Sequence, residues 1–276
     1  NSVKFPIIIK PAIGFFSMGV HKIENKSEWN SIIKKIKVEM EEIKNIYPKE
    51  VMDSTDFILE ELIEGEEYAV DCYFDAQSKP VVVNILHHIF SSGADMSDRV
   101  YTASAKIIRE NLDRMTEFLE KMGELTKVKN YPTHVEVRVT QSGEVIPIEA
   151  NPTRFGGWCS SPDLARYSLD INIVHYFLNN QKPDWYKILQ GKEDKVYSIV
   201  ILDNSTGYKN EQIESFDYDK LLNHFSNPLE LRKINYHEYP VFGFVFCETP
   251  QDEMDEIWDI LKSDLKEFVI LKNDKS

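Results

Sequence analysis

The chain has 276 residues, of which 42% are hydrophobic, enough for a real core in one large or two modest domains. Its 32 basic and 46 acidic residues give a formal charge of −14, which argues against a general surface for nucleic acid or for an anionic membrane. The three cysteines, Cys72, Cys159 and Cys247, lack C-x-x-C spacing, and no long apolar run appears, so we expect a cytoplasmic protein with reduced thiols and no membrane span.

The first half of the chain alternates strand and helix signals. Residues 5–10 are a β-branched run that stops at Pro11, which predicts a strand, and residues 12–19 follow as a loop with a glycine near each end. Ser27 is expected to cap a helix that ends near Pro48. Further strands are expected at 20–23, 57–62, 67–74 and 80–90, a loop at 91–102, and a helix at 108–125.

The second half continues this mixture, so the class is α+β. Residues 133–140 and 145–151 are expected to be two strands joined by a Gln-Ser-Gly-Glu turn. Ser161 followed by Pro162 predicts the start of a helix, and the polar residues 181–194 predict a linker. Beyond it we expect strands at 196–202, 229–236, 241–247 and 267–271, and helices at 217–224 and 252–261.

The hairpin at 133–151 carries the densest polar chemistry. If residues 142–143 form a two-residue turn, Glu136 lies opposite Glu149 and His134 lies opposite Asn151. Two carboxylates facing each other across a strand pair repel, and a bound divalent cation would reverse that penalty. Oxygen ligands from two Glu and one Asn suit magnesium. The alternative is a register shifted by one residue, with both carboxylates in solvent.

The loop at 12–19 is a candidate phosphate-binding segment. A glycine-bounded loop after a strand can offer backbone N–H groups to phosphate oxygens, and Ser17 adds a hydroxyl donor. Lys10, at the end of the strand, supplies a positive charge. The residue order differs from a Walker motif. Phe15 and Phe16 are expected either to close the loop over a nucleotide or to make ordinary core contacts.

The segment 57–70, FILEELIEGEEYAV, is a strand, a turn at Gly65 and a second strand that begins near Glu67. The backbone of such a crossover can hydrogen-bond an adenine edge, and an acidic side chain just beyond it can hold ribose hydroxyls. An ordinary acidic hairpin is the alternative for this segment.

Two other features are less specific. His87 and His88 lie on an apolar strand, so one ring is expected to face inward with a partner and the other outward, in preference to a metal role. The loop 91–101 either contributes Asp98 or Arg99 to substrate or phosphate contacts, or is a solvated surface loop.

In their order along the chain, three segments resemble the ATP-grasp superfamily of carboxylate–amine and carboxylate–thiol ligases. FPIIIKPAIGFFSMGV resembles the strand, lysine and glycine loop of the lid, FILEELIEGEEYAV the hinge, and HVEVRV with VIPIEANPTRFGG the metal hairpin. The resemblance implies an α+β ATP-grasp fold, with a small α+β lid at 1–63, a larger and mainly antiparallel sheet core with helices at 64–192, and a small α+β C-terminal subdomain at 193–276. It also implies an N-terminal subdomain, which would precede the lid.

The same resemblance implies ATP and magnesium as cofactors, with one or two ions, or manganese in their place. Lys10 would contact the α- and β-phosphates, and the glycine loop would hold the γ-phosphate. The backbone at 60–63 would meet the adenine, and Glu67 the ribose. The implied nucleotide-binding residues are Lys10, Gly14, Ser17, Met18, Gly19, Glu60, Glu61, Leu62, Ile63 and Glu67.

The remaining implied residues follow the metal hairpin. Arg154 would steady the acyl phosphate and the substrate carboxylate, with Gly156 and Gly157 beside that intermediate; two residues separate Arg154 from Asn151, a spacing that varies among such ligases. The implied metal ligands are Glu136, Glu149 and Asn151.

The expected function is therefore an ADP-forming ligase that activates a carboxylate as an acyl phosphate and joins it to an amine, with amino-acid or peptide-like substrates. Two alternatives stay open: a regulatory module that binds ATP without turnover, and a small-molecule kinase on the same fold. The expected partners are small molecules, without nucleic acid or membrane, and a homodimer is compatible with the sequence.

Overall fold

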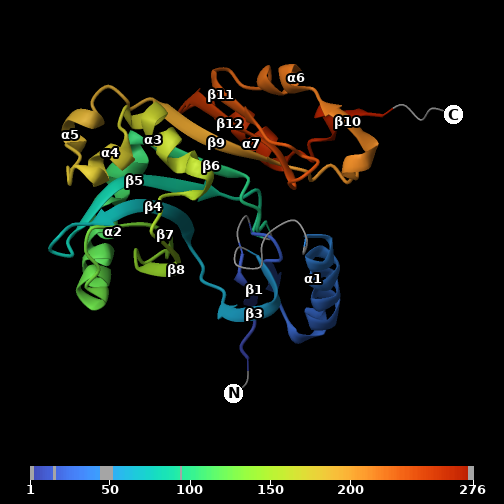
Figure 1. Ribbon diagram of the computed structural model, residues 1–276, viewed down its shortest axis with the longest axis horizontal. Coiled ribbons are helices and arrows are strands. Elements are labelled where there is room, and N and C mark those ends of the chain that lie inside the picture. Colours follow the sequence, from blue (N-terminus) through green and yellow to red (C-terminus); the bar gives the residue numbers. More distant parts are fainter. Residues whose placement is uncertain (1–2, 15–16, 44–51, 94, 273–276) are drawn as a thin grey trace. The chain divides into compact units, whose positions relative to one another are not determined.

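The computed structural model describes residues 3–14, 17–43, 52–93 and 95–272 (Figure 1). Contacts divide the chain into two units, residues 1–63 with 90–98 and residues 64–89 with 99–276. The three cysteines are free, with Cys72 and Cys247 buried and Cys159 exposed. Within the described part of the chain, no helix has the length and apolar character needed to cross a membrane.

The first unit is a small antiparallel sheet packed against one helix. The sheet has the order β2-β1-β3, and the helix α1 (Trp29–Ile43) follows the short 3-10 turn η1 (Lys26–Glu28). Side chains that recur every three or four residues along α1 pack on the isoleucines of β1, as the apolar spacing predicts. The strands are β1 (Ile7–Ile13), β2 (His21–Ile23) and β3 (Asp53–Glu61).

Two local predictions for this unit were wrong. Pro11 does not end β1, because it pairs with Phe57 of β3 just before a register shift; a proline is tolerated in a strand beside such an irregularity. Asn25, not Ser27, caps the helical segment, since its side chain accepts from the backbone N–H of Ser27. Pro48, the predicted end of the helix, lies outside the described residues.

The second unit is built on an eight-stranded antiparallel sheet with the order β11-β12-β9-β6-β5-β4-β7-β8. Two neighbouring pairs in this order, β6–β9 and β4–β7, join strands that are far apart in the sequence. The hairpin formed by β4 and β5 therefore lies inside the sheet and not at its edge. The strands are β4 (Glu66–Phe74), β5 (Pro80–Ile89), β6 (Val100–Ser104), β7 (Tyr131–Val139), β8 (Val145–Pro152), β9 (Lys195–Asp203), β11 (Pro228–Lys233) and β12 (Val241–Pro250).

Helix α2 (Ala105–Thr126) covers one face of β4 and β5 and forms the main core of the unit with them (Figure 1). Its N-cap is Ser104, whose hydroxyl accepts from the backbone N–H of Ile107. The packing is close, because a side chain at Gly123 would overlap the ring of Phe74. Since strand side chains alternate, Glu67, Ala69 and Asp71 of β4 point to the opposite face.

Shorter elements complete the second unit, and a second core lies under β9, β12 and α7. A two-stranded sheet, β10-β13, closes the C-terminal part. The elements are η2 (Gly157–Cys159), α3 (Ser160–Leu169), α4 (Ile173–Leu178), α5 (Trp185–Ile188), η3 (Asn210–Gln212), β10 (Ile213–Phe216), α6 (Tyr218–Leu222), α7 (Asp255–Lys262), η4 (Lys266–Phe268) and β13 (Val269–Leu271).

The structure differs from the sequence predictions in several places of this unit. Strand β6 occupies the end of the segment 91–102, which was expected to be a loop, and α5 lies within the expected linker 181–194. Ser161 does not cap α3, because the helix already begins at Ser160. The subdomain boundaries at 63 and 192 stay predictions; strands on both sides of residue 192 share the eight-stranded sheet.

Candidate functional site

Several polar side chains lie together on the face of the sheet opposite α2. Residues directly opposite in antiparallel strands point to the same side, so the pairings of β4 with β5 and β7, and of β7 with β8, assemble this face. The pairs are Glu67 with His88 and Arg138, Ala69 with Glu136, Asp71 with Asn84 and His134, Glu136 with Glu149, and His134 with Asn151.

The predicted pairing of the metal hairpin is confirmed: Glu136 lies opposite Glu149, and His134 lies opposite Asn151. The predicted turn was wrong. Thr140 and Glu144 pair through their backbones, so the loop has the three residues 141–143, with Gly143 at φ +87°. Relative to the predicted two-residue turn, such a loop shifts the pairing of β7 with β8 by one residue. A β-bulge after Pro147 of β8 shifts the pairing back.

The three predicted metal ligands therefore sit on one face of the sheet. Glu136 and Asn151 are half-buried and Glu149 is exposed. Among the described residues, no group of three or more His, Cys, Asp or Glu side chains is arranged to hold a metal ion; the predicted set here consists of two carboxylates and one amide.

Beside these residues, the carboxylate of Asp71 is fully buried and accepts three hydrogen bonds. His134 donates from Nδ1 to Oδ1 at 2.8 Å, the backbone N–H of Gly156 donates to the same oxygen at 2.9 Å, and the hydroxyl of Ser161 donates to Oδ2 at 2.5 Å. The other nitrogen of His134, Nε2, lies 3.7 Å from Oε1 of Glu136. Asp71 was not among the residues predicted from the sequence, since its partners are 63 to 90 residues away.

These neighbours shift the pKa of His134. Burial lowers its pKa, but Asp71, by charge and by hydrogen bond, and then Glu136 outweigh that effect, so the pKa is raised above its ordinary value even though Arg154 opposes this. The two carboxylates therefore favour the protonated form of His134.

The segment after β8 brings the predicted Arg154, Gly156 and Gly157 next to this cluster. Arg154 is exposed, and its Nη1 donates to the carbonyl of Phe155 at 3.1 Å. Gly156 is buried, and a Cβ there would lie 2.6 Å from Cβ of Ser161 and overlap its hydroxyl. Around Gly157 the space is open, with only Nη1 of Arg154 nearby, at 3.9 Å from a built Cβ.

Glu67, the predicted ribose ligand, lies in a partly buried cluster with His88 and Arg138. Its Oε1 is 2.8 Å from Nδ1 of His88, and its Oε2 accepts from Nε and Nη2 of Arg138 at 3.1 and 2.8 Å. Burial raises the pKa of Glu67, but the charges and hydrogen bonds of His88 and Arg138 outweigh it, so the pKa is lowered. His88 is buried, while His87 pairs with exposed Glu66, which confirms the expected difference between the two rings.

In the first unit, the structure joins Lys10 to Glu60, whose carboxylate lies 2.7 Å from Nζ. The hydroxyl of Ser17 donates to Asp98 at 3.1 Å, so the predicted phosphate loop contacts the segment 90–98. Gly19 has φ +74° and approaches Met40 so closely that a Cβ would lie 2.6 Å from its terminal methyl.

The other predicted nucleotide-binding residues of this unit lie at the loop and at the end of β3. Gly14 is exposed and Met18 half-buried, while Phe15 and Phe16 lie outside the described residues. Glu60 and Glu61 end β3, and Leu62 and Ile63 follow it, half-buried, outside the sheet.

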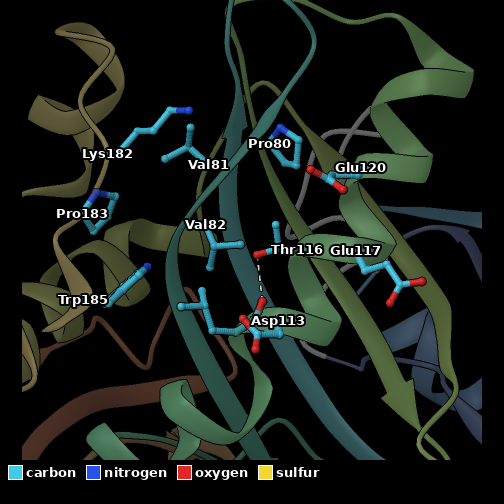
Figure 2. A pocket seen from close by; sticks show the side chains of 11 residues that line it. Pro80, Val81, Val82, Asp113, Thr116, Glu117, Glu120, Lys182, Pro183 and Trp185 are labelled. Atoms are coloured by element: carbon cyan, nitrogen blue, oxygen red, sulfur yellow. Dashed lines mark hydrogen bonds between the residues drawn. The ribbon is translucent and has the colours of Figure 1, made fainter.

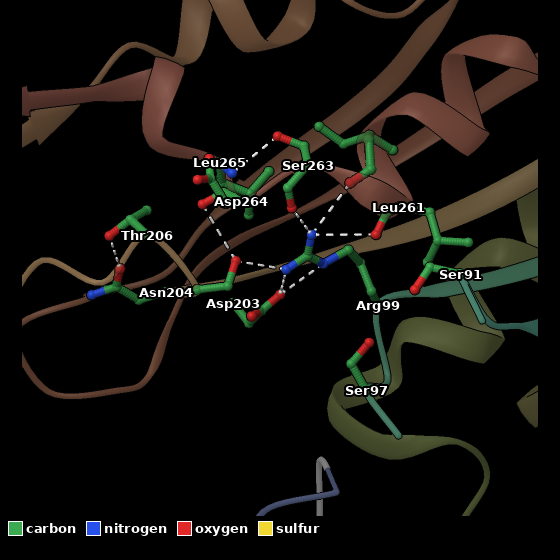
Figure 3. A network of polar contacts seen from close by, with 12 residues as sticks. Ser91, Ser97, Arg99, Asp203, Asn204, Thr206, Leu261, Ser263, Asp264 and Leu265 are labelled. Carbon is green, nitrogen blue, oxygen red and sulfur yellow. Dashed lines mark hydrogen bonds and ion pairs between the residues drawn. The ribbon is translucent and has the colours of Figure 1, made fainter. Parts of the chain in front are cut away.

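Arg99 has a buried, structural position and does not lie in a solvated surface loop (Figure 3). It is only 6% exposed. Its guanidinium donates to Asp203 at 2.9 Å from Nε and to Ser205 at 2.7 Å from Nη2. Nη1 reaches carbonyls at the end of α7, those of Ile260 at 3.3 Å and Ser263, a favourable place for a cation at a helix C-terminus.

A groove of about 380 Å³ lies away from the polar face, between α2 and the segment 182–185 (Figure 2). Its acidic side chains, Asp113, Glu117 and Glu120, lie on the exposed side of α2, and Glu117 pairs with Lys121 one turn further along the helix. We interpret it as a solvated helix surface, and the polar face is the candidate site.

Comparisons with known proteins agree with the arrangement described above. A sequence model of the ATP-grasp domain matches residues 3–162. Among curated proteins, no sequence matches this chain.

Solved structures with a similar fold include the following three. An L-amino acid ligase from Bacillus licheniformis superposes with a TM-score of 0.64 at 18% identity, covering 99% of this chain and 65% of the ligase. A biotin carboxylase from Campylobacter jejuni, in complex with an ATP analogue, gives 0.58 at 13% identity, covering 90% and 54%. N5-carboxyaminoimidazole ribonucleotide synthetase from Thermotoga maritima gives 0.55 at 16% identity, covering 97% and 62%. The chain thus spans between about half and two thirds of the length of these proteins.

Proposed function

This chain belongs to the ATP-grasp family, and from that premise we propose that it is the catalytic core of a ligase that uses ATP and magnesium to join a carboxylate to an amine. The proposed substrates are amino acids or peptide-like small molecules. The observation that carries the proposal is the opposition of Glu136 and Glu149 on the polar face, with Asn151 beside them and Arg154 three residues further on.

The hairpin residues fit a magnesium ion by their chemistry. Two carboxylates directly opposite each other on a sheet repel, and a divalent cation between them removes this penalty. Glu136, Glu149 and Asn151 would supply oxygen ligands, which magnesium prefers, and would leave positions for water and phosphate oxygens. When bound, the ion would neutralise negative charge on the phosphoryl group in transfer.

The proposed reaction has two steps. A substrate carboxylate oxygen takes the γ-phosphoryl group of ATP, which gives an acyl phosphate and ADP. The amine nitrogen then attacks the acyl carbon, phosphate leaves, and the nitrogen loses its proton. Arg154 is exposed and follows the hairpin directly, so its planar guanidinium is suited to hold the carboxylate through two hydrogen bonds. Gly157, with open space around it, allows the intermediate to approach the backbone.

For the nucleotide, the proposal assigns Lys10 to the α- and β-phosphates and the loop from Gly14 to Gly19, with Ser17, to the γ-phosphate. Lys10 is tied to Glu60 at 2.7 Å, so a nucleotide has to compete with that carboxylate for the ammonium group. The backbone at 60–63 is assigned to the adenine. Glu67 is assigned to the ribose, and its carboxylate already accepts from His88 and Arg138.

The test is a measurement of ADP release by the whole chain with ATP, magnesium and a panel of amino acids, offered singly and in pairs. The proposal expects ADP release that requires magnesium, a carboxylate and an amine together, with one peptide-like product per ADP. ADP release with a hydroxyl compound and formation of its phosphate ester would instead establish a small-molecule kinase. ATP binding without turnover on any pair would favour a regulatory module.

A further inference from the structure

The carboxylate of Asp71 connects three segments that are distant in the sequence. Its donors are His134 on β7, the backbone of Gly156 in the loop after β8, and Ser161 in the first turn of α3. A fully buried carboxylate is costly unless its oxygens are hydrogen-bonded. Three short bonds of 2.5 to 2.9 Å meet that requirement here, so the side chain is held in one orientation.

Two of these donors lead directly to residues of the proposed catalytic site. His134 is held at Nδ1 by Asp71, and its Nε2 lies 3.7 Å from Oε1 of Glu136, a proposed metal ligand. The bond from Gly156 fixes the loop that carries Arg154 and Gly157. A single oxygen, Oδ1 of Asp71, accepts from both His134 and Gly156, so the hairpin and the loop share one anchor.

The close packing at Gly156 supports this connection. A Cβ at this position would overlap the hydroxyl of Ser161 and lie 3.3 Å from Cε1 of His134. The loop can therefore approach Asp71 closely enough to donate its N–H only because residue 156 has no side chain. Asn84 adds a further contact on the same side, since its Nδ2 lies 3.3 Å from the carbonyl of Ser161.

We propose that Asp71 is a positioning residue, which acts through His134 on Glu136 and through Gly156 on Arg154, and so sets the distance between the metal ligands and the group that holds the substrate carboxylate. This inference rests on the proposed function. In this role Asp71 does not touch the substrate. It holds Glu136 and Arg154 in fixed positions relative to each other. Groups of this kind behind metal ligands typically change metal affinity or activity about 10- to 100-fold when they are replaced.

Asp75 offers a matched control at the end of the same strand. It is also a buried aspartate, and its Oδ1 accepts from the backbone N–H groups of Gln77 and Lys79 at 2.8 and 2.9 Å. These bonds close the turn between β4 and β5 and involve no proposed site residue. Asp75→Asn therefore removes the charge of a comparable buried carboxylate, whose bonded oxygen it keeps, without touching the connection to Glu136 or Arg154.

The experiment compares wild type, Asp71→Asn, Ser161→Ala and Asp75→Asn as whole chains. Manganese serves as the metal probe with a non-hydrolysable ATP analogue, and the paramagnetic resonance of free Mn²⁺ gives both the number of sites per chain and their Kd. Positioning predicts an unchanged number of sites with a Kd about 10- to 100-fold higher in Asp71→Asn, and a fall in kcat for the carboxylate- and amine-dependent release of ADP. Ser161→Ala, which removes one of three donors, should shift the Kd in the same direction by less.

The possible results separate the two proposals. Fewer sites per chain with an unchanged Kd in Asp71→Asn, as in a partly unfolded protein, together with an unchanged Kd in Ser161→Ala, would assign Asp71 to stability alone. A Kd raised equally in Asp75→Asn would have the same meaning. If Asp71→Asn does not fold, the Kd of Ser161→Ala decides: a raised Kd supports positioning, and an unchanged Kd assigns Asp71 to stability alone. A wild-type chain that binds no Mn²⁺ with the nucleotide would overturn the proposed function, and the positioning role with it.

Discussion

Arg138 of β7 donates from both Nε and Nη2 to a single oxygen of Glu67 on β4, at 3.1 and 2.8 Å, while the second oxygen of Glu67 lies 2.8 Å from His88 on β5. The three side chains come from three adjacent strands of the sheet. His88 also stacks on Tyr101 of β6, with ring centroids 4.2 Å apart. The cluster thus ties four neighbouring strands together at one end of the polar face.

This ion cluster predicts a pH dependence of stability. Because the pKa of Glu67 is held below its ordinary value of 4.5, its contribution is complete above that pH and is lost as the pH falls through the lower pKa of the folded protein. Glu67→Gln should lower the free energy of unfolding by about 3 kcal/mol at pH 7, since it leaves the half-buried guanidinium of Arg138 and the buried ring of His88 without their anionic partner. Urea denaturation at pH 7 and near pH 3.5 checks this, and the difference from wild type should shrink at the lower pH. A loss of unfolding free energy near pH 3.5 that is as large as the loss at pH 7 would contradict this prediction. The exposed substitution Glu144→Gln is the control.

The two adjacent glycines after β8 should respond differently to substitution. Gly156→Ala places a methyl group against Ser161 and should cost about 1–3 kcal/mol of stability, since the surrounding groups are held by Asp71. Gly157→Ala meets only the end of Arg154, at 3.9 Å, and should leave the free energy of unfolding unchanged. Chemical denaturation of the two variants is the measurement. Equal losses would show that the loop is not packed on Asp71.

The metal hairpin predicts a specific change in magnesium dependence. Glu149→Gln keeps the size of the side chain but removes the charge opposite Glu136, so the magnesium concentration for half-maximal ADP release should rise at least about tenfold, which corresponds to roughly 1.4 kcal/mol. Glu144→Gln, an exposed residue next to the loop of the same hairpin, is the matched control and should behave as wild type. A magnesium dependence that Glu149→Gln leaves unchanged would remove Glu149 from the set of ligands.

Arg99 should matter for stability and not for chemistry. Arg99→Met leaves Asp203 and the last carbonyls of α7 without their donor, and we expect a loss of about 2–3 kcal/mol, less than for a fully buried pair because Asp203 is 37% exposed. Arg109→Met, which breaks the exposed pair with Glu193, should cost less than about 1 kcal/mol. Denaturant unfolding compares them, and kcat per folded chain should be unchanged in both. A fall in kcat for Arg99→Met would return Arg99 to the substrate site.

Much of the local structure could be predicted from the pattern of side chains. The apolar positions of α1 and α2, spaced at three or four residues, lie on the faces that pack against the sheets. Strand β6 could not be predicted in this way, because a five-residue strand inside a polar segment has too few side chains to show an alternation, and its pairing with β5 and β9 defines it. The start of α3 was also misplaced, since Ser161 uses its hydroxyl for Asp71 and not for a helix cap.

By itself, the sequence determined which side chains share a face of each strand. The opposition of Glu136 and Glu149 also required an assumed turn, and the pairing agrees with the prediction because a bulge offsets the longer loop. The tertiary structure decided how that pairing is reached, by a three-residue loop and a compensating bulge, because local propensity does not fix loop length. It also decided that Asp71 meets His134, Gly156 and Ser161. Alternation indicates that a polar residue points inward, but its partner depends on which strands and loops pack beside it, 63 to 90 residues away.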